Sequence, residues 1–386
     1  MKHSKTNMHA PEAVVVACDI ITPYGLGVDV CWNGLLSGKT AINTLDRFDT
    51  AQFQTKKAAV IAELKTGQND SLVMQMLKPL LKKTSAVIPK NAFLILATIT
   101  GEIDILEKQV LNGKDNVSES APGCLLSKVQ SLSGIRSPGI IISAACTSSS
   151  SAIAQASAMI RSKERDCVLI VACDIVSEFV FAGFSSLMAL DKDTAQPFDK
   201  DRSGLSLGEA AGFVLVMSKE RALQEKRDII GEIAGWGLTN DANHMTGPSR
   251  DGSGLAMAMR KAMQSADISE DAVGCIAAHG TGTVYNDAME MKAFKSVFSS
   301  GALPTYSIKG GIGHTMGAAG LVETIIALRS LKEKLVLPTV NMHTADDEAD
   351  GWVSNKQCAF DSPVTISINA GFGGVNSALV LKKGDN

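Results

Sequence analysis

The sequence predicts an α/β protein built from two similar halves, each a sheet with helices packed on it. Short runs of β-branched residues, such as CVLIVAC at 167–173 and GFVLVMS at 212–218, alternate with Ala-rich stretches typical of helices. A charged stretch, SKERALQEKRD at 218–228, interrupts this pattern, which then restarts. We therefore expect an N-terminal half over residues 1–229 and a C-terminal half over residues 230–386.

Both halves contain a strand that leads into a helix of small residues. The first is ISAACTSSSSAIAQASAMI at 142–160, and the second is YSIKGGIGHTMGAAGLVETIIALRSL at 306–331. Helices rich in Ala, Gly and Ser let neighbouring backbones approach closely, and neither helix has a wide polar face. We expect these two helices to lie buried against each other between the halves.

Residues 50–135 form the segment with the weakest pattern. They contain the Lys-rich stretch LKPLLKKTS and the polar stretch LNGKDNVSES, with no clean hydrophobic period. We predict that this segment forms an insertion or a cap that faces a second subunit.

Composition places the chain among globular proteins. It has 386 residues, 45% of them hydrophobic and 20% charged, with a formal net charge of -3. This charge gives no general attraction to nucleic acid or to anionic lipid, so neither is an expected partner. The first residues are polar and the apolar run after them is strand-sized, so we expect no membrane insertion and a cytoplasmic location. The eight cysteines are scattered without zinc-type spacing, as in proteins of a reducing compartment.

Cys146 is the first candidate catalytic residue. It follows the apolar run GIIIS and opens the first small-residue helix. Free backbone N–H groups and the helix dipole at such a position stabilise a thiolate. They would therefore lower the pKa of the thiol and make the sulfur nucleophilic. A buried, inert cysteine at a strand end is the alternative that this segment alone leaves open.

His279 lies where the strand-like run CIAA meets a loop of Gly and Thr. Gly280 and Gly282 would let an extended ligand arm approach the backbone, and the hydroxyls of Thr281 and Thr283 could bond to amide groups of that arm. We expect an accessible imidazole here, although a lone histidine at such a place is more often structural.

Lys309 and His314 stand five residues apart in YSIKGGIGHTMGAAG, before the second small-residue helix. The glycines between them leave little side-chain bulk, so both side chains could face one pocket. A phosphate-binding loop is a weak alternative, because the P-loop spacing and its Lys-Ser/Thr ending are absent.

The last candidate is the loop GFGG at 371–374. Gly371 and Gly373 flank Phe372 and would let it swing as a gate, while the backbone N–H of Phe372 could donate to an oxyanion. An ordinary β-hairpin turn would produce the same pattern.

In this combination and order, the four segments closely resemble the elongating β-ketoacyl-ACP synthases of the thiolase superfamily, of the type II fatty-acid and polyketide kind. The resemblance covers nearly the whole chain, and it includes QPFDKDRSGLSLGEAAGFVLV at 196–216 and the loop NDANHMTGP at 240–248, which resembles a family loop near the active-site entrance. It implies the thiolase fold, a five-layered α-β-α-β-α sandwich of the two halves.

The resemblance also implies a reaction. Cys146 would accept an acyl group from acyl carrier protein, and this group would then condense with malonyl-ACP by a decarboxylative Claisen reaction to give 3-ketoacyl-ACP. The N–H groups of Cys146 and Phe372 would form the oxyanion hole. His279 and His314 would stabilise the enolate that forms when malonyl loses its carboxylate.

Supporting roles follow from the same resemblance. Lys309 would support His314 without touching the substrate and would pair with the buried Glu323. Thr281 and Thr283 would hold the pantetheine arm. No metal, nucleotide or flavin would be required, because decarboxylation generates the carbanion. The family also implies a homodimer, or a heterodimer with another ketosynthase-like subunit.

One departure and several alternatives stay open at this point. Cys146 comes earlier than in elongating relatives, so we expect 50–135 to be shortened or rebuilt, which leaves the acyl length, the unsaturation and the kind of pathway undetermined. A degradative thiolase would need a second cysteine in the C-terminal glycine loop, and a chain-initiating synthase would carry Asn in place of His314. A Cys-His hydrolase would leave Lys309 and the second histidine unexplained. A catalytically silent partner, similar to the chain-length factors, would lack the nucleophile.

Overall fold

The computed structural model describes residues 10–84, 86–113 and 120–384. Its N-terminal half contains a five-stranded sheet with the order β6-β5-β7-β8-β1. β5 is parallel to β6 and β7, whereas β8 is antiparallel to β7 and β1. The strands are β1 (Ala13–Thr22), β5 (Phe93–Ala97), β6 (Gly139–Ile142), β7 (Cys167–Asp174) and β8 (Ala210–Ser218).

The C-terminal half contains a second five-stranded layer with the order β11-β10-β14-β15-β9, and antiparallel pairing of β9 with β1 joins this layer to the first. β10 is parallel to β11 and β14, whereas β15 is antiparallel to β14 and β9. When each sheet is numbered along its own half, both orders read third, second, fourth, fifth, first, so the prediction of two similar halves is confirmed. The strands are β9 (Gly231–Asn240), β10 (Cys275–Ala277), β11 (Thr305–Tyr306), β14 (Val364–Gly371) and β15 (Val375–Lys383).

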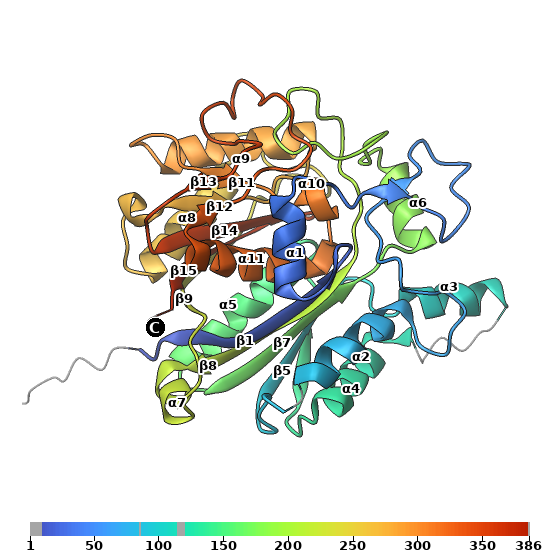
Figure 1. The fold of residues 1–386 in the computed structure, drawn as a ribbon, viewed down its shortest axis with the longest axis horizontal. Coiled ribbons are helices and arrows are strands. Elements are labelled where there is room, and N and C mark those ends of the chain that lie inside the picture. The colour runs from blue at the N-terminus through green and yellow to red at the C-terminus, as the bar shows by residue number, and fades with distance from the viewer. Residues whose placement is uncertain (1–9, 85, 114–119, 385–386) are drawn as a thin grey trace, which may run out of the picture.

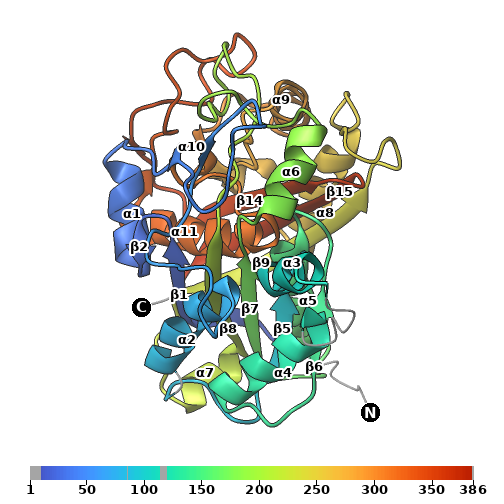
Figure 2. The same cartoon turned by 90° about the vertical axis from the view of Figure 1, so that its right-hand side faces the viewer.

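Helices and sheets alternate in five layers, as Figures 1 and 2 show, and this confirms the predicted sandwich. α5 (Ser148–Arg161) and α11 (Ala319–Glu333) form the central layer between the sheets. The outer layer of the N-terminal half contains α2 (Leu72–Thr84) and α4 (Pro122–Ser133), and that of the C-terminal half contains α8 (Ser253–Ser265) and α9 (Val284–Val297).

The two central helices pack where their side chains are smallest. A Cβ atom on Gly320 would lie 2.7 Å from both the Cβ and the backbone nitrogen of Ser150. The hydroxyl of Ser149 accepts the N–H of Leu321 at 2.9 Å, and the hydroxyl of Ser150 lies 2.6 Å from that of Ser377 in the opposite sheet. Close packing of α5 on α11 therefore agrees with the expectation from the small-residue helices.

The expectation that 50–135 is an insertion or cap is wrong for much of that segment. β5 pairs with a strand on each side, and all five of its residues are buried. α2 buries one apolar face against the same sheet. A short strand that is buried on both faces has no alternation of polar and apolar residues, so FLILA shows no period in the sequence.

The remaining elements are short or lie around the sandwich. They are β2 (Gly25–Leu26), α1 (Val28–Leu36), β3 (Asn43–Thr44), β4 (Lys57–Ala58), α3 (Ile103–Leu111), α6 (Glu178–Ser186), α7 (Lys219–Gln224), η2 (Glu270–Ala272), α10 (Lys309–Ile312), η3 (Met316–Ala318), β12 (Leu335–Val336) and β13 (Cys358–Ala359). Within the described residues, none of these helices or the longer ones has the length and apolar character needed to cross a membrane.

Candidate functional site

Cys146 lies in a tight turn between the end of β6 and the start of α5. Ala145, directly before it, has a φ of 48°, a left-handed conformation that residues with a side chain rarely adopt. The turn is fixed by the hydroxyl of Ser148, which accepts the N–H of Ala144 at 2.8 Å. The predicted place of Cys146 at the head of the helix is therefore confirmed, and its side chain is buried.

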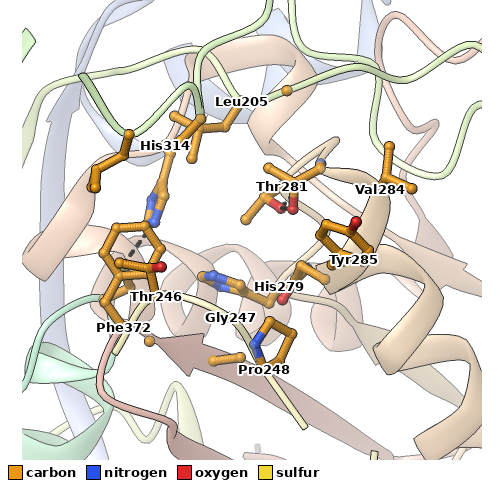
Figure 3. Close-up of a pocket in the computed structure, with 18 of the residues that line it drawn as sticks. Leu205, Thr246, Gly247, Pro248, His279, Thr281, Val284, Tyr285, His314 and Phe372 are labelled. Carbon is orange, nitrogen blue, oxygen red and sulfur yellow. Dashed lines mark hydrogen bonds between the residues drawn. The ribbon is translucent and has the colours of Figure 1, made fainter. Parts of the chain in front are cut away.

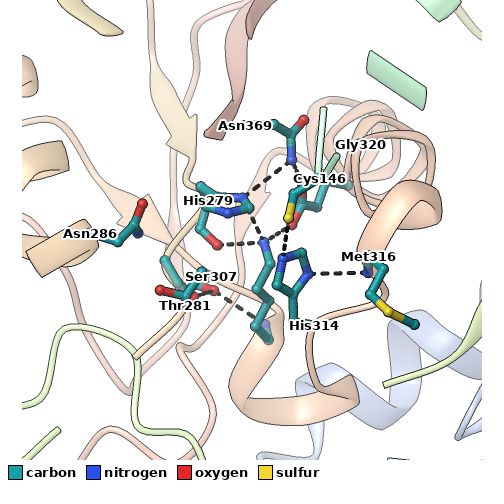
Figure 4. Close-up of polar contacts among 12 residues, drawn as sticks. Cys146, His279, Thr281, Asn286, Ser307, His314, Met316, Gly320 and Asn369 are labelled. Atoms are coloured by element: carbon teal, nitrogen blue, oxygen red, sulfur yellow. Dashed lines mark hydrogen bonds and ion pairs between the residues drawn. The ribbon is translucent and has the colours of Figure 1, made fainter. Parts of the chain in front are cut away.

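Two histidines from the other half lie beside this cysteine. The Nε2 atom of His314 is 2.9 Å from the Sγ atom of Cys146. The His279 ring lies at 5.2 Å from the His314 ring, measured between centroids, and the rings are nearly perpendicular. The structure thus brings together the three side chains that the sequence assigned to one pocket (Figure 4).

Hydrogen bonds on the far side of each ring fix where the ring protons lie. The Nδ1 atom of His314 accepts the backbone N–H of Met316 at 3.2 Å. The Nδ1 atom of His279 lies 3.2 Å from the ammonium of Lys309, which has only hydrogens to donate. Each neutral imidazole must therefore carry its proton on Nε2.

Both histidines are neutral in this environment. Burial, together with the positive charge of Lys309, lowers the pKa of His279 and of His314 well below the ordinary value. Two neutral imidazoles with Nε2–H groups are hydrogen-bond donors, and they can stabilise an anion that forms between them.

The role predicted for Lys309 needs a correction. Its ammonium contacts Nδ1 and the backbone oxygen of His279, and it forms a buried ion pair with Glu323. The pairing with Glu323 agrees with the prediction, but the histidine that Lys309 supports is His279 and not His314. The spacing of five residues to His314 was misleading, because the short helix α10 directs the lysine toward the end of β10.

The pKa predicted for Cys146 was also wrong in direction. Burial raises the pKa of this thiol to about 11, and the charge of Lys309 and the N–H of Phe372 oppose this rise only in part. Desolvation outweighs the effect of the helix N-terminus because the sulfur is enclosed by protein. The thiol is therefore protonated at neutral pH.

The GFGG loop combines the two interpretations that the sequence left open. It is the turn of the hairpin between β14 and β15, and it also covers the cysteine. The backbone N–H of Phe372 donates to the sulfur of Cys146, and a Cβ atom on Gly371 would lie 3.2 Å from the backbone nitrogen of Cys146. Gly373 has a φ of 84°, which a side chain would disfavour.

Phe372 also closes one wall of the site. Its ring stacks on that of Phe184 from α6, with 5.6 Å between centroids. The swinging of Phe372 as a gate stays a prediction.

A cavity of about 600 Å³ connects the three catalytic candidates with the surface (Figure 3). His314 and Phe372 lie at one side of it, and Tyr285 and Val284 at the other. The walls include Thr281 and Thr283, and residues 243, 244 and 246–248 of the loop that the sequence placed near an entrance.

The glycines beside His279 have a different purpose from the one predicted. A Cβ atom on Gly280 would lie 2.5 Å from the Cβ atom of Ser307, and one on Gly282 would lie 2.8 Å from the backbone oxygen of Gly204. These glycines therefore make room for other segments of the chain and not for a ligand arm. His279 itself is 2% exposed, so it is reached only through the cavity.

Two carboxylates that the sequence reasoning missed hold the His279 loop. Glu290 accepts the N–H groups of His279 and Gly280 at 2.7 and 2.6 Å, and Asp287 accepts the N–H of Thr281 at 3.0 Å. Their spacing of three residues at the start of α9, directly after a glycine loop, is the signal that could have revealed them. Burial raises the pKa of Glu290 to about 8.

Asp174 and Asn369 were missed as well, at the ends of β7 and β14. Asp174 is fully buried and accepts N–H groups of Ile99, Thr100 and Gly317, which ties the loop after β5 to the loop that carries His314. Asn369 contacts Glu323 and lies near His279. For Asp174, the available signal is an aspartate at the end of an otherwise apolar strand.

Among the described residues, the donor atoms of Cys146, His279 and His314 could also hold a metal ion, since they lie within 4.8 Å of one another. The ammonium of Lys309 lies against His279 and would repel a cation. The prediction that the enzyme needs no metal stays a prediction.

Sequence comparisons find relatives of this chain in one protein family. Residues 101–222 match the family "Beta-ketoacyl synthase, N-terminal domain", and residues 230–343 match "Beta-ketoacyl synthase, C-terminal domain". The 3-oxoacyl-[acyl-carrier-protein] synthase 2 of Vibrio harveyi is 31% identical over 412 residues, with 97% of this chain and 99% of that protein covered. The protein of the same name from Staphylococcus aureus (strain COL) is 28% identical, with 96% and 98% covered.

Solved structures of ketosynthases have the same fold as this chain. The ishigamide ketosynthase/chain length factor has a TM-score of 0.87 at 27% identity, with 97% of this chain and 99% of that chain covered. A β-ketoacyl synthase from Burkholderia phymatum STM815 has a TM-score of 0.86 at 25% identity, with the same coverage. The alignment with the Vibrio harveyi protein is longer than the 386 residues of this chain, so that protein contains residues that this chain lacks.

Proposed function

Because this chain belongs to the β-ketoacyl synthase family, we propose that it is an acyltransferase that condenses a Cys146-bound acyl group with malonyl-ACP and releases 3-oxoacyl-ACP. The observation that carries the proposal is the meeting of Cys146 with two Nε2–H donors at the inner end of one cavity. A nucleophile alone would fit many enzymes, but two neutral donors that face it fit a reaction in which an enolate forms next to a thioester.

In the first step the sulfur of Cys146 attacks the thioester carbonyl of the acyl carrier protein's pantetheine arm. The new bond joins Sγ to the acyl carbon, and the bond from that carbon to the pantetheine sulfur breaks. The proton of the Cys146 thiol passes in net terms to the departing thiol. The N–H groups of Cys146 and Phe372 would bind the oxyanion of the tetrahedral intermediate, within the loop that Gly371 and Gly373 shape.

In the second step malonyl-ACP enters the emptied arm site. Its carboxylate leaves as carbon dioxide, and the electron pair of the broken bond forms an enolate at the thioester. The Nε2–H groups of His279 and His314 donate to the enolate oxygen, where the charge develops. The nucleophilic carbon then attacks the acyl group, and Sγ leaves as a thiolate that takes up a proton.

This chemistry needs no cofactor in our proposal, because the decarboxylation itself generates the carbon nucleophile. Lys309 and Glu323 do not reach the cavity in the proposed mechanism: they hold His279 in place. Thr281 and Thr283 line the cavity, where an extended pantetheine arm would pass. The carrier protein itself would dock at the mouth of this cavity.

We also propose a homodimer, in which β6 pairs with its counterpart. β6 is the terminal strand of its sheet within the described residues, so one edge of its backbone is open. Ile140 on this strand is 36% exposed, and an open apolar edge favours pairing with a second strand. A monomer in light scattering would contradict this assembly. A cytoplasmic location belongs to the same proposal, since acyl carrier protein is its expected substrate carrier.

The proposal is tested by incubation of the purified chain with acyl carrier protein that carries a radiolabelled acyl group. A labelled adduct that Cys146→Ala abolishes, followed by condensation when malonyl-ACP is added, is the expected result. Absence of any adduct would favour the silent partner of another ketosynthase, and release of free acid without condensation would favour a hydrolase. A mass spectrum of the acyl group trapped on Cys146 in the native host would identify its length and unsaturation.

A further inference from the structure

We propose that Asn369 is a positioning residue of this site, which fixes His279 as a hydrogen-bond donor and holds Glu323 as the partner of Lys309. This inference rests on the proposed function and deepens it. Asn369 lies on β14, three residues before Phe372, and is fully buried. It contacts His279 itself and Glu323, the ion partner of Lys309, and it is not among the residues that line the cavity.

The amide nitrogen of Asn369 contacts two acceptors of the catalytic network. It donates to the Oε2 atom of Glu323, and it lies 3.5 Å from the Nδ1 atom of His279 (Figure 4). An amide NH₂ group has two N–H donors, and the two acceptors lie on the same side of Asn369.

The ammonium of Lys309 has no further hydrogen to donate to the Oε2 atom of Glu323. Its three hydrogens are directed to Nδ1 of His279, the backbone oxygen of His279 and the Oε1 atom of Glu323. The second oxygen of the Glu323 carboxylate is therefore left to Asn369. Lys309, Glu323, Asn369 and His279 form a closed ring of polar contacts.

The orientation of the amide supports this assignment. The Oδ1 atom of Asn369 is buried without a hydrogen-bond partner, close to Gly320 of α11. In the reversed orientation this oxygen would face the carboxylate of Glu323 and the Nδ1 lone pair of His279, and both of these are acceptors. The unpaired oxygen is tolerated because the two N–H groups are needed on the other side.

The consequence concerns the direction in which His279 donates. With Asn369 in place, Nδ1 is surrounded by donors and the ring proton stays on Nε2, facing the cavity. Without Asn369 the Oε2 atom of Glu323 loses its donor and can draw the ammonium of Lys309 away from Nδ1, so that Nδ1 takes the ring proton and donates it to the carboxylate. His279 would then present a lone pair to the enolate oxygen, which disfavours the condensation step and leaves attack by Cys146 unaffected.

The experiment compares the two half-reactions in Asn369→Ala and in a matched control, Ser367→Ala. Ser367 is a buried polar residue two positions away on the same face of β14, and its hydroxyl has no partner. Radiolabelled acyl-ACP measures acylation of Cys146, and malonyl-ACP added to the acylated enzyme measures condensation. For Asn369→Ala we expect roughly a tenfold or greater loss in the condensation rate, by analogy with partners that orient a metal-binding histidine. Acylation and the apparent KM for malonyl-ACP should change less than about twofold, and the control should leave both steps near wild type.

The variant Asn369→Asp provides a second test, the pH dependence of the condensation rate, which a purely structural role of Asn369 would not change. An ionised aspartate has no hydrogen to donate, whereas a protonated one has a single O–H donor. The condensation rate of this variant, relative to wild type at the same pH, should therefore rise as the pH falls. This variant is close to isosteric, so it also serves if Asn369→Ala does not fold.

Several outcomes would overturn the inference. Equal losses of acylation and condensation in Asn369→Ala would show general damage to the site, and unchanged kinetics would show that the contacts are dispensable. If the condensation rate of Asn369→Asp, relative to wild type, does not change with pH, Asn369 does not act as a hydrogen-bond donor. Failure of the proposed function is a separate result, since it would appear as a wild-type protein that is not acylated or does not condense.

Discussion

The two halves share one strand order but contribute different chemistry to the same cavity. In the N-terminal half, four residues after the end of β6 lead to Cys146, and α5 follows at once. In the C-terminal half, the equivalent strand β11 ends eight residues before His314, and this longer connection also contains Lys309. The shared topology thus brings the two connections together at the central helices, while their lengths and residues decide which one carries the nucleophile and which the donors.

The connection between the fourth and fifth strands differs even more. In the C-terminal half it is the tight turn at 372–374, which places Phe372 over the cysteine. In the N-terminal half the equivalent connection spans residues 175–209 and includes α6, whose Phe184 stacks on Phe372. The short turn of one half and the long connection of the other together cover the site, so two halves with the same strand order form a single asymmetric site.

The largest expected effect comes from Lys309, which has no counterpart in the N-terminal half. Lys309→Ala leaves the buried carboxylate of Glu323 without its ion partner, and this should lower the free energy of unfolding by about 3–5 kcal/mol. Denaturant titration checks the value. The control is Lys295→Ala, which removes an ion pair with Glu348 between half-exposed side chains. It should change the free energy of unfolding by no more than about 1 kcal/mol. A similar small loss in both variants would contradict the structural role given to the buried pair.

The next effect separates the chemistry of the two halves. His314→Ala removes one donor to the enolate and should lower the condensation rate by about 10²- to 10³-fold, in the range found when a single oxyanion donor is deleted. Acyl transfer to Cys146 should stay largely intact, because in the proposed mechanism the N–H groups of Phe372 and Cys146 bind the oxyanion of that step. Single-turnover measurements of both steps decide the matter, and an equal decline in the two rates would refute this division of labour.

A smaller effect tests the contact between the halves. Gly320→Ala on α11 would place a methyl group 2.7 Å from atoms of Ser150 on α5 and should destabilise the fold by about 1–3 kcal/mol. Gly123 lies in α4 with open space around its Cα, so Gly123→Ala should instead be neutral or stabilise by up to about 1 kcal/mol. Thermal unfolding of the two variants provides the comparison. A stable Gly320→Ala protein would show that the central helices have room to separate.

The smallest effect concerns the resting state of the nucleophile. Because burial raises the pKa of Cys146 to about 11, its thiolate fraction at neutral pH is low and should increase about tenfold for each pH unit up to that value. The rate of alkylation by iodoacetamide, measured by mass spectrometry at this cysteine, should follow the same rise. If the alkylation rate instead reaches a plateau below pH 9, the pKa of the thiol is lowered by the helix N-terminus, as the sequence suggested.

The sequence by itself determined the α/β class, the two halves and the residues of the motifs. Cys146, His279, Lys309 and His314 were identified from short segments, because strand ends that run into glycine loops and small-residue helices are local features. Glu323 was assigned only by the resemblance to the family. The strand β5 escaped notice for the opposite reason, since a fully buried run of five apolar residues has no periodic signature.

Only the tertiary structure decided what these residues do to one another. That Lys309 supports His279, that the thiol of Cys146 is protonated, and that Asn369 completes the network all depend on distances between elements far apart in the chain. Desolvation and hydrogen-bond geometry are properties of the assembled interior. They arise where the two sheets close over α5 and α11, and no segment of the sequence contains them alone.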